Sequence, residues 1–166
     1  MIIRKEIPSD AGAITDITIA AFKDCPYSRN TEQFIIKALR AANALAVSLV
    51  AEEDGKVVGH IAFSAVTFTD GSENWYGLGP VSVEPSCQKQ GIGTKLVREG
   101  LKLLKEMGSE GCVLVGDPKF YKRFGFKSPD GLSHEGVPQE NFLALSFCNR
   151  IPAGTVHFHP AFWATE

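Results

Sequence analysis

Residues 78–107, LGPVSVEPSCQKQGIGTKLVREGLKLLKEM, constrain the fold of this chain more than any other stretch. They read as a strand, a short turn with two glycines, and a long helix. Apolar residues recur in the last part at three- and four-residue steps, which is typical of one buried face of an amphipathic helix. That face comprises Ile92, Leu96, Val97, Leu101, Leu104 and Met107. Gly108 follows at the position where many helices end in a left-handed residue.

The strand before the turn is predicted from alternation. Val81 and Val83 flank Ser82, so apolar and polar side chains point to opposite faces. Pro80 cannot donate a hydrogen bond to a neighbouring strand, and such prolines lie on edge strands or at bulges. We therefore expect either an edge strand or a bulge near Gly79-Pro80.

The turn itself, residues 88–93, has the chemistry of a phosphate site. Gly91 and Gly93 lack a Cβ atom, so a ligand can approach the backbone closely. The first turn of a helix leaves amide groups without partners, and its dipole favours an anion. These properties together predict a phosphate or pyrophosphate cradle. The alternative is that the two glycines only tighten a strand-to-helix turn, because a bare G-x-G is weak evidence.

The bulk properties exclude several classes of protein. A length of 166 residues predicts a single domain covering residues 1–166, and the formal net charge of −2 with no long basic run argues against nucleic-acid or membrane-surface binding. The chain shows no signal peptide and no membrane-spanning apolar run, so we expect a soluble cytoplasmic protein. No C-x-x-C pair is found among the four cysteines, Cys25, Cys87, Cys112 and Cys148. We expect reduced thiols and no zinc site, and the oligomeric state, monomer or homodimer, stays open.

The first half of the chain predicts two helices and an antiparallel meander. Residues 2–7 read as a strand, and Ser9 is suited to cap a helix that runs to about Phe22. Asn30 and Gln33 resemble a capping box for a second helix. Three strands then follow, joined by turns at Asp54-Gly55 and Asp70-Gly71-Ser72, at residues 45–53, 57–69 and 75–83.

The second half predicts a crossover and closing strands. Residues 112–115 form a short apolar strand after the long helix, and a right-handed crossover makes it parallel to residues 75–83. Residues 119–126 read as a short helix that stops at Gly125. Residues 142–147 and 155–158 are expected to be closing strands. The fold class is therefore α+β or mixed α/β: a mostly antiparallel sheet with one parallel pair around the long helix, flanked by helices.

Two motifs in this order resemble the GNAT superfamily of N-acetyltransferases. The Q-x-x-G-x-G signature is formed by Gln88, Gly91 and Gly93, between a strand and a long helix. The segment Phe120–Phe126, F-Y-K-R-F-G-F, is similar to the second conserved segment of that superfamily. Gly116-Asp117-Pro118 before it resembles the bacterial YhbS-type subgroup. The resemblance covers most of the chain, from Ile2 to Phe126, and implies an N-acetyltransferase with acetyl-CoA as co-substrate and no metal.

The resemblance also assigns a cofactor-binding set. Backbone amides from Gln88 to Thr94 would hold the pyrophosphate, and main-chain groups of Val81 and Val83 would pair with the pantetheine arm. Lys89, Lys95 and Lys122 are candidates for charge near the phosphates, although surface lysines need no such role. The full set that we expect to contact the cofactor is Val81, Ser82, Val83, Gln88, Lys89, Gln90, Gly91, Ile92, Gly93, Thr94, Asp117 and Phe120.

Tyr121 falls where the superfamily places its general acid. A phenol stays protonated at neutral pH and can donate to a leaving thiolate. The backbone N–H of Ser82 or Val83 is a candidate donor to the oxyanion. Many members carry a glutamate just before the V-x-V stretch, but this chain has Leu78-Gly79-Pro80 there. The general base is therefore unassigned, and Glu84 is more simply a solvated residue.

Other functional readings compete with acetyl transfer. A non-catalytic module that binds or senses CoA would use the same turn. A nucleotide dehydrogenase fits poorly, because its fingerprint needs a third glycine. The two predicted N-terminal helices offer a wall for a substrate cleft, or merely solvated residues, through Tyr27, Arg29, Glu32 and Arg40.

The histidines are the remaining candidates for a site. His157 and His159 share one strand face, but no further metal ligand is evident for them. His60 reads as a hydrogen-bonded sheet residue, and His134 is unplaced. The acceptor amine, a small molecule or a protein amine, is not identified by the sequence.

Overall fold

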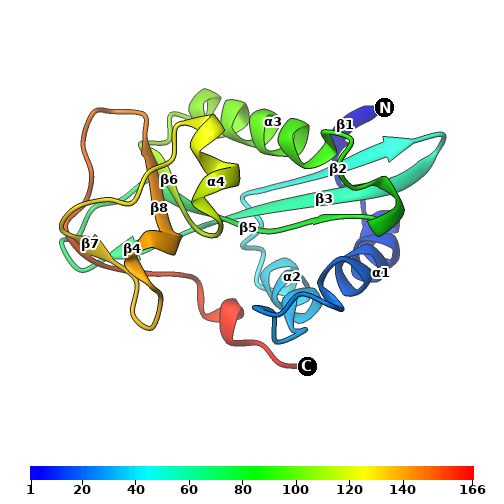
Figure 1. Cartoon of the computed structure of the whole chain (residues 1–166), viewed down its shortest axis with the longest axis horizontal. Coiled ribbons are helices and arrows are strands. Elements are labelled where there is room, and N and C mark those ends of the chain that lie inside the picture. The colour runs from blue at the N-terminus through cyan, green and yellow to red at the C-terminus, as the bar shows by residue number, and fades with distance from the viewer.

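The computed structural model describes residues 1–166, and its centre is a six-stranded sheet in the order β1-β2-β3-β5-β6-β8 (Figure 1). Every neighbouring pair is antiparallel except β5 and β6, which run parallel. The mixed sheet with one parallel pair is therefore confirmed. Its strands are β1 (Ile2–Lys5), β2 (Val47–Glu53), β3 (Lys56–Ala65), β5 (Trp75–Val83), β6 (Gly111–Val115) and β8 (Phe142–Ser146).

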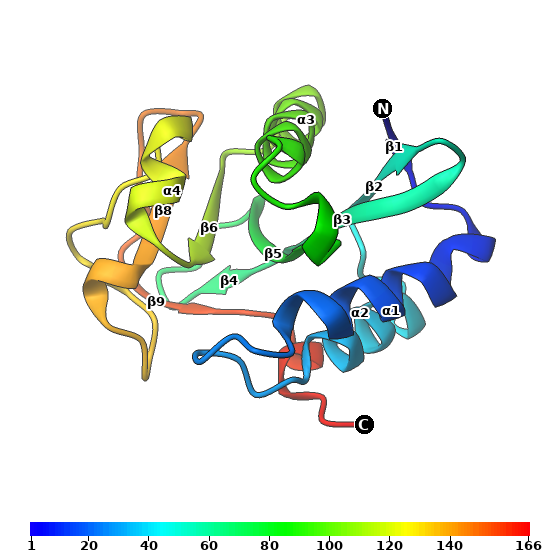
Figure 2. The same cartoon turned by 45° about the vertical axis from the view of Figure 1, so that its right-hand side comes forward.

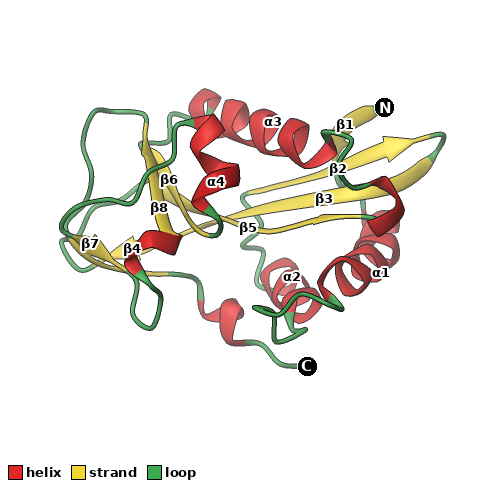
Figure 3. Ribbon diagram, in the orientation of Figure 1, coloured by secondary structure: helices red, strands yellow, loops and turns green.

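Helices cover both faces of this sheet (Figures 2 and 3). Helix α3 (Ile92–Glu106) lies on one face, and helices α1 (Ala11–Phe22) and α2 (Glu32–Ala41) lie on the other. The short helix α4 (Pro118–Tyr121) continues as a 3-10 turn and stops at Gly125, which has φ 97°. No helix combines the length and the apolar character needed to cross a bilayer.

The apolar stripe of α3 packs on the sheet as the periodicity predicts. Leu96, Val97 and Leu104 are fully buried there, against strands that include Phe63. A Cβ at Gly100 would overlap the Phe63 ring, so the helix approaches the sheet closely at that point. The expected contribution of Met107 to this stripe is wrong: the helix ends at Glu106 and the Met107 side chain is 49% exposed.

A second, smaller sheet in the order β4-β9-β7 differs from the prediction. It joins β4 (Thr67–Phe68), β9 (Gly154–His157) and β7 (Leu132–Ser133). The predicted strand 57–69 thus breaks at Val66, because Phe68 turns into a separate core around Trp75 and Val156. Of the two expected closing strands, β8 closes the main sheet, whereas β9 belongs to the small one.

Two predicted helix caps are also wrong. The carboxylate of Asp10, rather than the Ser9 hydroxyl, accepts from the Ile7 amide at 2.8 Å, in a 3-10 turn before α1. At α2 the N-cap is Thr31, and Asn30 adopts a left-handed φ of 58°. The Gln33 amide donates to the Asn30 carbonyl at 3.1 Å, so the reciprocal capping box does not form.

Candidate active site

The site is organised by a fork between the two parallel strands. Strands β5 and β6 pair over only three residues each, Trp75–Gly77 against Gly111–Val113. Beyond Gly77, β5 stays with β3 and leaves β6. A bulge accompanies this departure: Leu78 faces Phe63 and Val81 faces Ile61, so Gly79 and Pro80 together oppose a single residue. The bulge expected at Gly79-Pro80 is confirmed, and it lies where the fork opens.

The arm of β5 beyond the fork presents free main-chain groups. The Glu84 amide donates to the Val58 carbonyl at 2.8 Å, and Val83 lies opposite Gly59. Hydrogen-bonded and non-bonded pairs alternate in an antiparallel ladder. Main-chain groups of Glu84 and Ser82 therefore face β3, whereas those of Val81 and Val83 face the open side of the fork. Of the two candidate oxyanion donors, this leaves the Val83 N–H free.

The turn before α3 carries six consecutive amides without a hydrogen-bond partner, from Lys89 to Thr94. The first intrahelical bond runs from the Lys95 amide to the Gly91 carbonyl, at 3.1 Å. Gly91 caps the helix with φ 84°, a conformation that glycine adopts without steric cost. Around Gly93 there is space, because a Cβ there would lie 3.9 Å from Val83 and 4.0 Å from Phe120. The turn is therefore an open nest of donors at a helix N-terminus.

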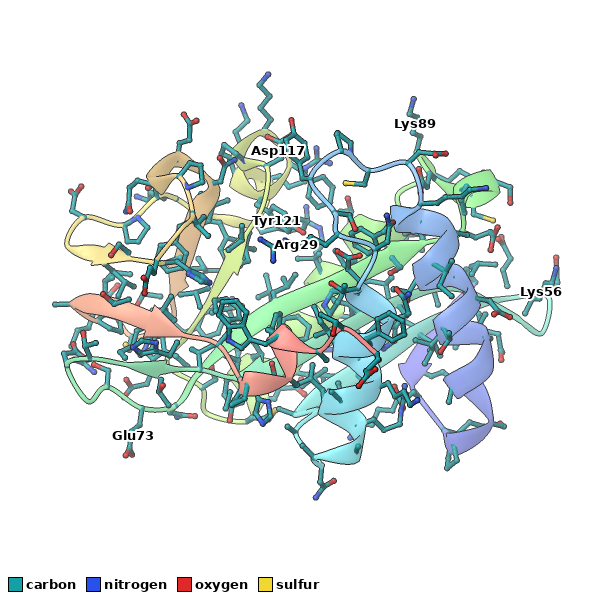
Figure 4. The ribbon with its side chains drawn as sticks, turned by 90° about the horizontal axis from the view of Figure 1, so that it is seen from below. Arg29, Lys56, Glu73, Lys89, Asp117 and Tyr121 are labelled. Atoms are coloured by element: carbon teal, nitrogen blue, oxygen red, sulfur yellow. The ribbon has the colours of Figure 1, made fainter.

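Several residues predicted to contact the cofactor use their side chains in hydrogen bonds within the protein. Gln88 Nε2 donates to the Val83 carbonyl at 3.0 Å, so its side chain ties the turn to β5. The Asp117 carboxylate accepts from the Lys119 amide at 2.9 Å and caps α4. Ser82 is buried and its hydroxyl contacts Thr18 at 3.3 Å. In Figure 4 the Lys89 side chain points outward from the turn.

Tyr121 lies on the other arm of the fork. A Cβ at Gly116, just after β6, would lie 2.6 Å from the Tyr121 ring, so only glycine allows this packing. The aromatic rings of Phe120, Phe124 and Phe126 surround the phenol. Its hydroxyl makes no protein hydrogen bond. Burial, reinforced by Cys112, raises the pKa of Tyr121 to about 12.

A cleft of about 750 Å³ opens between the arms and extends toward α1 and α2. Tyr121 lines it together with the bulge of β5, while Phe22, Glu32 and Ile35 come from the two helices. Sequence reasoning missed the third wall, which is formed by the loop and the C-terminal segment: His134, Glu135, Gly136, Val156, His157, Phe158, Phe162 and Trp163. The signal for it was the density of aromatic residues after residue 155.

Of the four residues proposed for a cleft wall, only Glu32 lines the cleft. Glu32 lines the cleft and accepts from Ser28 Oγ at 2.6 Å. Arg29 is exposed, and in Figure 4 it points toward the position of Tyr121. Tyr27 is 94% exposed, and Arg40 forms an ion pair with Glu6 at 2.9 Å, outside the cleft. The wall is thus built mainly by apolar residues of α1 and α2.

A buried polar cluster lies apart from the cleft. His60 Nε2 lies 2.8 Å from Ser48 Oγ, which confirms the expected hydrogen-bonded sheet residue. Burial alone would raise the pKa of Glu6, but hydrogen bonds from His60, Arg40 and Ser48 outweigh it and hold that pKa well below its ordinary value. No three His, Cys, Asp or Glu side chains are grouped to hold a metal ion. The His159 ring accepts from the Ala161 amide at 3.0 Å.

Comparison with known proteins gives one family. The model of the acetyltransferase (GNAT) family matches residues 13–126. The uncharacterised N-acetyltransferase YhbS of Escherichia coli K12 is 38% identical over 128 residues, which are 76% of this chain and 74% of that protein. A GNAT acetyltransferase from Brucella melitensis, solved in complex with acetyl-CoA, has 51% identity and a TM-score of 0.87 over 97% of both chains. The E. coli YhbS structure in complex with CoA has 32% identity and a TM-score of 0.83, over 97% of this chain and 91% of that one.

Proposed function

The chain belongs to the acetyltransferase (GNAT) family, and we propose that it moves the acetyl group of acetyl-CoA to an amine inside the fork between β5 and β6. The observation that carries this proposal is the run of six free amides at residues 89–94, beside the open edge of β5. The two similar structures that hold acetyl-CoA and CoA support the same ligand here.

The donor set fits the chemistry of acetyl-CoA. A diphosphate is an acceptor of many hydrogen bonds, and the amides from Lys89 to Thr94 offer donors at the positive end of the α3 dipole. The pantetheine arm contains two amides, which pair with the free C=O of Val81 and the free N–H of Val83. Phe120 lies beside Gly93 and borders the same space. This arrangement directs the thioester toward Tyr121.

Two groups of the protein then serve the transfer. The Val81 N–H, which faces the open side of the fork and lines the cleft with Tyr121, is the donor for the oxyanion that develops on the thioester carbonyl. The Tyr121 phenol gives its proton to the departing thiolate sulfur. Because burial keeps the pKa of Tyr121 about 12, the phenol stays protonated throughout the neutral range.

The non-catalytic alternative would need the donor nest but not Tyr121. The free hydroxyl of a buried tyrosine in the cleft favours catalysis, because a purely structural tyrosine usually satisfies its hydroxyl. All four cysteines are unpaired, as in a reducing compartment, and we place the enzyme in the cytoplasm.

Thiol release from acetyl-CoA, measured against a panel of small amines and amine-bearing peptides, tests the function. We expect release that depends on the amine, with the acetylated amine detected by mass spectrometry. Tight CoA binding without release against the whole panel would instead identify a sensing module.

A further inference from the structure

The cleft passes through the fork and joins the two faces of the sheet. Tyr121 belongs to the core that α3 covers. On the opposite side, Phe158 packs on Gly77, the last β5 residue paired with β6, where an added Cβ would lie 2.5 Å from its ring. Phe158 is partly buried and packs against the core that includes Trp75 and Val156. The cleft therefore runs from Tyr121 to the opposite face of the sheet, where residues of α1 and α2 line it.

His134 lies on the side of the sheet that faces α1 and α2, and it contacts Phe158, the ring that packs on Gly77 at the fork. Its imidazole stacks on Phe158, with ring centroids 5.2 Å apart and planes 23° apart. The edge of Phe142 supports the same imidazole at 6.1 Å. Two aromatic contacts thus hold a half-buried histidine one ring away from Gly77.

The hydrogen bond of His134 determines its tautomer. Nδ1 lies 3.1 Å from the carbonyl oxygen of Glu135. A carbonyl oxygen only accepts, so Nδ1 carries the hydrogen and donates it. Nε2 then holds the lone pair and has no partner in the protein. Burial lowers the pKa of His134 below its ordinary value, so the ring is neutral at pH 7.

The surroundings of His134 favour an amine carried on an apolar body. Phe22, Phe162 and Trp163 line the same side of the cleft. The titratable groups that share the cleft are Glu32, Tyr121, Glu135 and His157, and no lysine or arginine lines it. Glu135 raises and His157 lowers the pKa of His134, while Arg29 is exposed outside this lining. The two carboxylates attract an incoming ammonium ion.

We propose that an amine bearing an aromatic or aliphatic group binds on the α1–α2 side of the fork and that His134 Nε2 is its general base. This inference rests on the proposed function and deepens it. Nε2 takes one proton from the ammonium, and the neutral nitrogen forms a bond to the thioester carbon. The C–S bond breaks, Tyr121 protonates the sulfur, and the nitrogen releases its second proton to solvent to leave the neutral amide. His134 then returns its proton to solvent, and Tyr121 regains one from it. Acid and base act from opposite faces of one fork.

The kinetic test compares His134→Asn with His159→Asn, using 2-phenylethylamine as acceptor. Asparagine at residue 134 keeps a donor for the Glu135 carbonyl but lacks Nε2, and asparagine at residue 159 keeps an acceptor for the Ala161 amide. We expect His134→Asn to lower kcat/KM about 100-fold at pH 7. The deficit should shrink toward pH 9.5, where free amine no longer needs a base. His159→Asn should match the wild type.

Three results would overturn the assignment of His134. They are wild-type kcat/KM in His134→Asn, a deficit that is the same at pH 7 and pH 9.5, or a loss explained by a lower melting temperature. If the wild type itself releases no thiol with any amine, the proposed function fails instead.

A binding measurement tests the subsite without turnover. Long-range proton–nitrogen NMR reports each histidine ring in the wild-type protein. We expect His134 to show the Nδ1–H tautomer and its signals to move to saturation with 2-phenylethylamine, but not with glucosamine at the same concentration. Unmoved His134 signals, or equal movement with both amines, would refute the acceptor class.

Discussion

Gln88 and Val83 are joined by a hydrogen bond of 3.0 Å from the side-chain amide to the main-chain carbonyl. The bond fixes the free amides of the turn relative to the open edge of β5. It also occupies the outward carbonyl of Val83 and leaves its N–H free. One side chain therefore sets the geometry of two parts of the proposed acetyl-CoA site.

Gln88→Ala should weaken CoA binding because the turn loses this anchor. One such hydrogen bond contributes about 1 kcal/mol, which corresponds to roughly a fivefold rise in Kd. Isothermal titration with CoA measures the change. Gln33→Ala is the matched control, since the Gln33 side-chain amide also donates to a main-chain carbonyl, that of Asn30 at 3.1 Å, but lies outside the site, and its Kd should equal that of the wild type. Equal Kd values for both variants would remove Gln88 from the site.

Tyr121→Phe should lower kcat by about 100-fold or more while the Kd for CoA stays unchanged. The hydroxyl makes no protein hydrogen bond, so its loss leaves the packing of the ring intact. Stopped-time thiol release and calorimetric CoA binding measure the two quantities separately. Turnover at the wild-type level would exclude Tyr121 as the acid.

Gly93→Val should raise the Kd for CoA about tenfold, because the side chain enters the space beside Val83 and Phe120 that we assign to the ligand. Gly12→Val is the matched control: Gly12 is also the second residue of its helix, and nothing lies within 4 Å of an added Cβ. Both variants should lose similar stability in thermal unfolding. A Kd that changes equally in the two variants would contradict the assignment of Gly93.

The raised pKa of Tyr121 predicts a loss of stability at alkaline pH. The folded state holds the phenol proton up to about pH 12, whereas the unfolded chain releases it near its ordinary value of 10.0. The contribution is complete below pH 10 and declines as pH rises toward 12, by about 1 kcal/mol at pH 11. Urea unfolding of the wild type and Tyr121→Phe at pH 8 and pH 11 measures it. Between pH 8 and pH 11 the free energy of unfolding should fall by about 1 kcal/mol more in the wild type than in the variant. Equal losses in the two proteins would show that the pKa of the phenol is not raised.

The parts of the fold that depend on local patterns were predictable from sequence. The stripe from Ile92 to Leu104, the bulge at Pro80 and the helix end at Gly125 follow from periodicity, the missing proline donor and glycine chemistry. The parallel pairing of β5 and β6 follows from the handedness of crossovers. The Q-x-x-G-x-G motif indicated the family, which the comparisons confirm.

The predictions that were wrong or missing concern contacts between distant parts of the chain. Asp10 displaced Ser9 at the first helix because Arg4 and the Ile7 amide both bind its carboxylate. The sequence of residues 155–158 does not indicate that β9 pairs with β4 and β7. The third wall of the cleft was missed for the same reason: His134 and Phe158 are far apart in sequence and meet only through the small sheet.

Binding of CoA at the fork is tested by titrating the isotopically labelled wild-type protein with CoA and following every backbone amide by NMR. We expect saturable shifts that are largest at residues 89–94 and at Val81 and Val83, where free N–H groups meet the diphosphate and the pantetheine arm. No saturable shift, or shifts confined to surfaces away from the fork, would contradict binding there.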